Sequence, residues 1–204
     1  MAKTVFFGGT FNPPHIAHRL MLEVVANRED VEKILVIPTN LPPHKEQPGV
    51  TASGEDRLSM CKLLADGIVK AEVSDMELKR GGKSYSFDTL SDLKPIYPQL
   101  YMIIGGDMIT SFTTWFRYKD ILKLCGIFAV RRPGVDNEEF DKAVEDLQNE
   151  GGNILIIESR MPDVSSTELR SAFETGKELV NVLPKNIAEF IKKKGLYTVD
   201  RSRY

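Results

Sequence analysis

The fold is decided by one stretch near the start of the chain, Phe6-Phe7-Gly8-Gly9-Thr10-Phe11-Asn12-Pro13-Pro14-His15-Ile16-Ala17-His18. Residues 4–7 are β-branched or aromatic and contain no breaker, which predicts a strand. The two glycines are expected to end that strand and to let a ligand approach the backbone closely. Apolar residues then recur at helical spacing from Ile16 to Val25, so a helix is predicted to begin near His15. A strand, a glycine turn and a helix N-terminus together predict a site for an anion such as phosphate.

Two histidines, His15 and His18, stand three residues apart and are expected on the same side of the first helical turn. A glycine turn after a first strand is common in α/β proteins, and a single histidine is usually a surface or core residue. Half of a metal site is a weaker alternative, because both cysteines are far away in sequence and no H-E-x-x-H motif is present. The P-loop pattern G-x-x-x-x-G-K-[ST] is absent too. The combination favours phosphate binding by the pair over coincidence.

Residues 9–18 resemble the G-x-F-x-P-x-H-x-G-H signature of a nucleotidyltransferase superfamily that uses two histidines on nucleotide phosphates. Ala17 departs from the signature, which commonly has glycine at this position. Alanine is the smallest replacement and suits a helix, so the departure changes little.

Composition bounds the class of protein. At 204 residues the chain is expected to form one nucleotidyltransferase domain, residues 1–204, with a sizeable core. A formal net charge of −2 gives no support for nucleic-acid or membrane binding. Cys61 and Cys125 lie in apolar, helix-like surroundings, which favours buried free thiols over a disulfide. No signal peptide and no apolar run of transmembrane length is apparent, so a cytoplasmic location is expected.

Strands and helices alternate along the rest of the chain. Strands are predicted at residues 33–37, 73–78, 100–104, 127–130 and 154–157, with helices between them and a last helix from Pro184 to Gly195. This order predicts an α/β fold with a mostly parallel sheet. In such a sheet, ligands bind beyond the carboxyl ends of the strands.

The segment after the second strand, Pro38-Thr39-Asn40-Leu41-Pro42-Pro43-His44-Lys45, cannot be helical and is expected at that ligand-binding edge. His44 and Lys45 are placed there to meet an anion, although a solvated loop explains Lys45 taken alone. As a unit, the segment resembles the substrate loop of the nicotinate-nucleotide adenylyltransferases, one branch of the superfamily.

Two further segments resemble parts of the same branch. Residues 84–90 resemble its S-Y-T-x-D-T-L segment, whose first residues bind the pyridine nucleotide, and Ser86 stands where threonine is usual. Helix capping explains these polar side chains about as well as a substrate role. Ile104-Gly105-Gly106-Asp107 followed by Trp115 resembles I-G-x-D followed by a tryptophan that stacks on the pyridine ring, although a lone tryptophan is more often a core anchor. Arg132 matches the arginine of the family's R-P-G motif.

The second informative stretch is Val164-Ser165-Ser166-Thr167-Glu168-Leu169-Arg170. Ser165 or Ser166 is predicted to cap a helix whose first-turn N–H groups face an anion, and Arg170 projects from the same turn as a fork for phosphate oxygens. A capped helix with an exposed arginine is the plainer interpretation. The stretch resembles the superfamily's I-S-S-T-x-I-R motif, and its pairing with the histidine stretch is specific.

The resemblance covers residues 8–170 and is to the bacterial nicotinate-nucleotide adenylyltransferases. It implies a Rossmann-like, doubly wound sheet with helices on both faces. It also implies a reaction of nicotinate mononucleotide with ATP that gives deamido-NAD and pyrophosphate, in NAD biosynthesis. Mg²⁺ would be carried mainly by the ATP phosphates, without metal ligands from the protein. Assembly into a homo-oligomer is left open.

The resemblance assigns roles to particular residues as well. The catalytic residues would be His15, His18, Lys45 and Arg170. The ATP site would be lined by Gly8, Gly9, Thr10, Phe11, His15, His18, Ile104, Gly105, Asp107, Arg132, Ser165, Ser166 and Arg170. The pyridine mononucleotide would be bound by Asn40, His44, Lys45, Tyr85, Ser86 and Trp115.

Two other functions compete with this one. A pantetheine-phosphate adenylyltransferase would share the histidine and S-S-T-x-x-R motifs, but it should lack the P-P-H-K loop and the S-Y-x-x-D-T-L segment, both of which are present. A catalytically silent nucleotide sensor should have lost a histidine or the arginine of these motifs, and none is lost.

Overall fold

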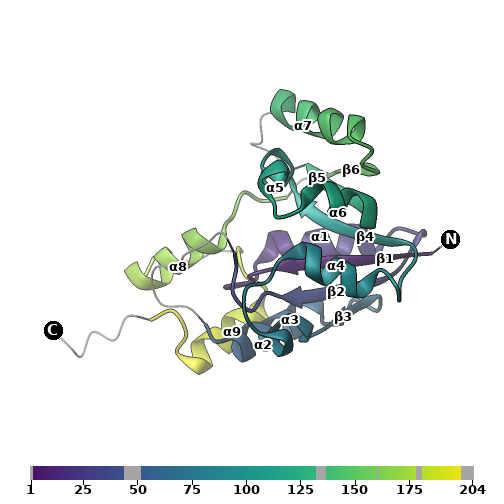
Figure 1. Ribbon diagram of the computed structural model, residues 1–204. Helices are drawn as coiled ribbons and strands as arrows, with labels where there is room; N and C mark the ends of the chain where they lie inside the picture. The colour runs from purple at the N-terminus through teal and green to yellow at the C-terminus, as the bar shows by residue number, and fades with distance from the viewer. Residues whose placement is uncertain (1, 44–51, 132–136, 160, 178–180, 199–204) are drawn as a thin grey trace.

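The structure is a computed structural model that describes residues 2–43, 52–131, 137–159, 161–177 and 181–198. Within these ranges, six strands form one sheet in the order β3-β2-β1-β4-β5-β6 (Figure 1). They are β1 (Lys3–Gly9), β2 (Val31–Pro38), β3 (Ala71–Val73), β4 (Leu100–Gly105), β5 (Gly126–Arg131) and β6 (Ile154–Glu158). The pairings between neighbouring strands are all parallel. This confirms the predicted doubly wound α/β fold, in which the chain builds the sheet outward from β1 in both directions.

Helices cover both faces of the sheet (Figure 1). They are α1 (Ile16–Ala26), α2 (Gly54–Ala65), α3 (Met76–Arg80), α4 (Ser86–Leu93), α5 (Gly106–Thr110), α6 (Tyr118–Leu124), α7 (Asn137–Asn149), α8 (Ser166–Thr175) and α9 (Lys185–Lys194), with a 3-10 turn at Phe112–Thr114. Among the described residues, none of these helices combines the length and the apolar character that a membrane span requires.

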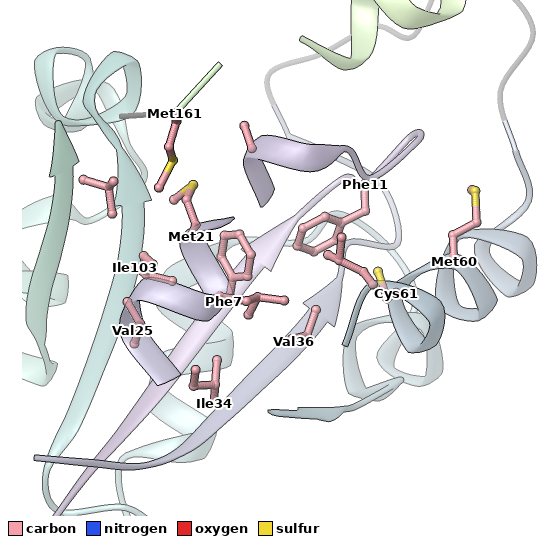
Figure 2. Packing of buried hydrophobic residues seen from close by; sticks show 14 of the residues in the cluster. Phe7, Phe11, Met21, Val25, Ile34, Val36, Met60, Cys61, Ile103 and Met161 are labelled. Atoms are coloured by element: carbon pink, nitrogen blue, oxygen red, sulfur yellow. The ribbon is translucent and has the colours of Figure 1, made fainter. Parts of the chain in front are cut away.

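The buried side chains form two clusters, one on each face of the sheet. The α1 cluster includes Val5, Phe7, Met21, Leu22, Val25, Met60, Leu64, Leu169, Ile187 and Ile191. The α4 cluster includes Phe6, Leu90, Leu93, Ile109, Ile121, Phe140 and Val144. Figure 2 shows part of the α1 cluster, where Phe7 lies among side chains of α1, β2 and β4. Because successive strand residues point to opposite faces, burial of both faces demands apolar residues throughout, which explains the continuous apolar runs.

The first strand ends at the two glycines, as predicted, and includes both of them. Gly8 and Gly9 are the last residues of β1 and pair with Ile37 and Pro38 of β2. A Cβ atom at Gly8 would overlap the ring of Phe6. The protein's own aromatic ring therefore requires this glycine, whatever a ligand requires.

The strand predicted at residues 73–78 is wrong. β3 ends at Val73, and α3 begins at Met76. The hydroxyl of Ser74 accepts a hydrogen bond from the N–H of Met76 at 3.3 Å, which turns the chain into the helix. β3 is an edge strand of three residues, paired only with β2.

The two cysteines are buried free thiols, as predicted. Burial raises the pKa of Cys125 to about 12 and raises the pKa of Cys61 as well. Both thiols therefore stay protonated and act as small core side chains.

We expect Gly126→Ala to destabilise the protein, because Gly126 pairs with Tyr101 and a Cβ atom there would overlap the Tyr101 ring. That ring is held in place by stacking on Phe128 at 5.0 Å between centroids and by a 2.9 Å hydrogen bond from Asn153 Nδ2 to its hydroxyl. The free energy of unfolding in urea should fall by about 1–3 kcal/mol. The loss should shrink in a Tyr101→Leu background. Equal losses in both backgrounds would contradict the explanation.

Candidate active site

His15 and His18 lie together at the start of α1, as the spacing predicted. His15 is the N-cap residue and is buried, and the two ring centroids are 3.8 Å apart. The backbone N–H of His15 donates to Nδ1 of His18 at 3.2 Å. Because Nδ1 accepts this bond, the neutral His18 ring carries its proton on Nε2. His18 therefore offers an N–H donor on the side of the ring away from its own backbone.

Aromatic rings support His18. The ring of Phe11 meets it edge-on at 5.1 Å between centroids, and Phe7 lies 6.0 Å away. Phe11 has φ of 49°, in the left-handed region where a non-glycine residue is strained. Phe11 is 2% exposed, so it supports the His18 ring from within the core.

α8 is bonded to the histidine loop, which we define as residues 10–15. Ser166 Oγ donates to the carbonyl of Pro13 at 2.9 Å, and Arg170 Nη1 donates to the carbonyl of Asn12 at 2.8 Å. Figure 1 shows α8 lying beyond the carboxyl end of β1. The fold thus brings together the two informative stretches, which are 153 residues apart at the Ser166–Pro13 contact.

The helix starts themselves offer fewer donors than the sequence suggested. Ser165, not Ser166, caps α8, and its Oγ accepts from the N–H of Glu168 at 3.2 Å. The N–H of Ile16 in α1 donates to the carbonyl of Val182 at 3.0 Å. Since these first-turn N–H groups already have acceptors, the histidine and arginine side chains are the stronger candidates for phosphate binding.

The three segments predicted to bind the pyridine nucleotide also contact one another, namely the loop after β2, residues 84–90 and the residues around Trp115. The N–H of Asn40 donates to Ser84 Oγ at 2.8 Å, and Asn40 Nδ2 donates to the carbonyl of Gly82 at 2.9 Å. The ring of Tyr85 lies 4.7 Å from that of Phe116, next to Trp115. Ser84 therefore holds the loop after β2 and does not cap α4, whose N-cap residue is Tyr85 without a side-chain capping bond.

Trp115 is half-buried and packs on Phe112 at 5.1 Å between centroids. The contact with Phe112 agrees with the core-anchor interpretation, and the residue is nevertheless partly exposed. Its neighbour Phe116 is the more open aromatic ring, at 48% exposure. Ile104 and Gly105 are buried at the end of β4, and Asp107 is exposed in the first turn of α5.

Some predicted site residues lie outside the described residues, namely His44, Lys45 and Arg132. Among the described residues, no group of three or more His, Cys, Asp or Glu side chains could hold a metal ion.

Comparison with known proteins adds independent findings. The cytidylyltransferase-like family model matches residues 6–172. A protein of Fusobacterium nucleatum named probable nicotinate-nucleotide adenylyltransferase is 36% identical over 194 residues, which cover 94% of this chain and 97% of the relative. A protein of Oceanobacillus iheyensis with the same name is 34% identical and covers 99% and 100%.

The chain belongs to the nicotinate-nucleotide adenylyltransferase family.

A solved structure supports the fold. The nicotinic acid mononucleotide adenylyltransferase of Plasmodium falciparum, complexed with NaAD, superposes with a TM-score of 0.82 at 17% identity, over 97% of this chain and 98% of that one. At this identity the likeness concerns the fold alone. It matches the Rossmann-like sheet described above.

Sequence reasoning missed three buried polar residues that hold this adenylyltransferase site together. Asn12 Oδ1 accepts from the N–H of Ala52 at 3.1 Å and from the hydroxyl of Tyr197 at 2.8 Å. Burial raises the pKa of the Tyr197 hydroxyl, so it remains a neutral donor. Arg57 is the third, with 5% exposure and bonds to backbone carbonyls. Nothing in the sequence near Arg57 or Tyr197 signals these contacts, because their partners lie in other elements.

Glu77 has a buried carboxyl group that is hydrogen-bonded to Thr89 and Ser84. Thr89 Oγ1 donates to it at 2.6 Å, and Arg80 Nη2 donates to Thr89 Oγ1 at 2.6 Å. Burial raises the pKa of Glu77 by more than the Thr89 hydrogen bond and the charge of Arg80 lower it. The folded protein therefore holds the Glu77 proton more tightly than the unfolded chain does.

We expect Glu77→Gln to change the pH dependence of stability. With a raised folded-state pKa, the contribution of Glu77 is fully present below its unfolded value near 4.5 and is lost as the pH rises through the folded pKa. At pH 4 the melting temperature of the variant should thus be close to that of wild type. Toward pH 8 the melting temperature of the variant should rise relative to that of wild type. Glu145→Gln, at an exposed position of α7, is the control and should show little change. A difference for Glu77→Gln that is constant across the pH range would contradict the argument.

Proposed function

We propose that the protein transfers the AMP moiety of ATP to nicotinate mononucleotide, giving deamido-NAD and pyrophosphate, as a step in NAD biosynthesis. The observation that carries this proposal is the pair His15 and His18 at the start of α1, with Arg170 of α8 bonded to the loop that precedes them. The family membership supports the same activity.

The reaction asks for little covalent chemistry from the protein. An oxygen of the mononucleotide phosphate attacks the α-phosphorus of ATP, and the bond to the β-phosphate breaks with its electron pair leaving on pyrophosphate. The attacking phosphate is already an anion, so no general base is needed. Catalysis of this kind rests on positioning and on stabilising the charge that develops.

His18 is proposed to donate from Nε2 to an α-phosphate oxygen, and His15 and Arg170 to neutralise the other phosphates. The guanidinium of Arg170 has five N–H donors, so the hydrogen bonds to Asn12 and to Thr167 leave capacity for phosphate. Mg²⁺ bound to the ATP phosphates would supply further charge neutralisation. Lys45, His44 and Arg132 keep the roles predicted from the sequence.

The pyridine side is proposed to favour the acid over the amide. Ser86 is the first residue of α4, so its N–H and that of Phe87 belong to the first turn, where the helix provides no acceptor. Such donors suit a carboxylate, whereas the NH₂ group of a carboxamide would face another donor. Stacking on Trp115 would hold the ring.

We also propose that residues 1–204 act as one domain. The two clusters of buried side chains share the strands of a single sheet, and α9 near the C-terminus packs in the same cluster as α1.

Steady-state kinetics on the two mononucleotides test the proposed function. With ATP saturating, nicotinate mononucleotide should exceed nicotinamide mononucleotide by roughly a hundred-fold or more in kcat/KM, measured as pyrophosphate release. Equal efficiencies would contradict acid specificity and leave a pyridine-nucleotide adenylyltransferase. Pyrophosphate release with phosphopantetheine instead would favour the pantetheine-phosphate alternative.

The role of His18 is tested separately. Removing one preorganised donor should lower kcat of His18→Ala by roughly a hundred-fold or more, with the melting temperature showing that the variant is folded. His18→Gln, whose amide nitrogen lies near the position of Nε2, should retain more activity than His18→Ala. A folded His18→Ala with wild-type turnover would remove the histidine from the mechanism.

A further inference from the structure

The chain segments that follow β1 and β2 diverge where these two strands end, and we call these two segments the branches. The two strands stay paired as far as Gly9 and Pro38, and the N–H of Thr39 still donates to the carbonyl of Gly9 at 2.9 Å. Beyond this point, Thr10 leads into the histidine loop and Asn40 leads into the pyridine-side segments. The separation of these two branches of the chain sets the distance between the proposed ATP residues and the proposed pyridine residues.

The guanidinium of Arg57, in α2, lies between the two branches. Its Nη1 donates to the carbonyls of Thr10 at 3.0 Å and of Thr39 at 2.6 Å, and its Nη2 donates to the carbonyl of Asn40 at 3.3 Å. One planar guanidinium thus bonds to both branches. An ammonium group on a flexible stem cannot reproduce this geometry.

The burial of Arg57 indicates that these bonds matter. The residue is 5% exposed, and burial of a charged group is costly unless it is well hydrogen-bonded. Burial lowers the pKa of Arg57 from its usual value, yet an arginine remains charged at neutral pH. An apolar side chain of similar length would fill the space without that cost, but it would leave the carbonyls unsatisfied.

The start of α2 is itself fixed against the histidine loop. Ser53 caps α2 by accepting from the N–H of Asp56 at 3.1 Å, and the N–H of Ala52 donates to Asn12 Oδ1. Arg57 therefore projects from a helix start that is already bonded to the histidine loop, and its guanidinium bonds this helix to the branch after β2 as well.

We propose that Arg57 is a positioning residue that holds the histidine loop and the loop after β2 at a fixed separation, and so aligns the two bound nucleotides for adenylyl transfer. The inference rests on the proposed function. Arg57 contacts the loops by their backbone and acts on the substrates through them. Because a small misplacement of reacting groups costs a large factor in rate, the loss of Arg57 should weaken binding of both nucleotides and slow the chemical step.

The test compares Arg57→Met with Arg57→Lys and a matched control. Arg19 is the control, because its Nη1 also bonds to two carbonyls, those of Leu64 and Asp66 at 2.6 Å each, at the far end of α2. Calorimetry measures the affinities for ATP and for nicotinate mononucleotide separately, kinetics measures kcat, and thermal melting measures stability.

Both nucleotides should bind about tenfold more weakly to Arg57→Met, and its kcat should fall about a hundred-fold. The affinities and kcat of Arg57→Lys should lie between those of Arg57→Met and wild type, since lysine keeps the charge but lacks the planar set of N–H donors. Arg19→Met should lose stability but keep wild-type affinities and kcat.

Two results would overturn the role of Arg57. One is a folded Arg57→Met or Arg57→Lys with wild-type affinities and kcat, and the lysine variant alone suffices if the methionine variant does not fold. The other is an Arg19→Met that loses as much affinity and kcat as Arg57→Met, which would make the effect one of stability. A wild-type protein that binds neither nucleotide would instead refute the proposed function.

Discussion

The histidine loop has carbonyl groups that no strand can satisfy, and much of the site is built to satisfy them. Residues 12–15 are buried, where an unpaired carbonyl would cost free energy. The carbonyl of Thr10 accepts from Arg57 of α2, and those of Asn12 and Pro13 accept from Arg170 and Ser166 of α8. Two helices distant in sequence are thereby drawn to one loop.

This constraint explains why the same residue types serve structure and the proposed chemistry. Arginine brings several donors in a rigid fork, so Arg170 can bond to a carbonyl and still face a phosphate. The loop also binds the end of the described chain, because the hydroxyl of Tyr197 donates to Asn12 Oδ1. Chain segments from β1 to the residues after α9 thus converge on the loop that carries the histidines.

Sequence reasoning recovered those features that depend on local pattern. Continuous apolar runs predicted β1, β2, β4, β5 and β6, and the spacing of His15 and His18 predicted their contact. It failed where a contact between distant elements decides the structure. The sequence around Arg57 carries no sign of its contacts with the carbonyls of two loops, and the sequence around Gly8 does not show that the ring of Phe6 fills the space where a Cβ atom would lie. The strand predicted at residues 73–78 is wrong because Ser74 turns the chain into α3.

The order of the strands accounts for the division of the site into two sides. β1 is followed by α1, whose buried residues lie in the α1 cluster, whereas β4 is followed by α5, whose Ile109 lies in the α4 cluster. The connections therefore leave the adjacent strands β1 and β4 toward opposite faces of the sheet, and in open α/β sheets ligands bind at such a switch point. The histidines approach it from the α1 face, while Trp115 and α4 approach it from the other face. For two nucleotides to react at this edge of the sheet, the histidine side and the pyridine side of the site must be held at a fixed separation. Since α2 packs in the α1 cluster yet bonds through Arg57 to the loop that reaches Ser84, it is the element whose geometry can do so.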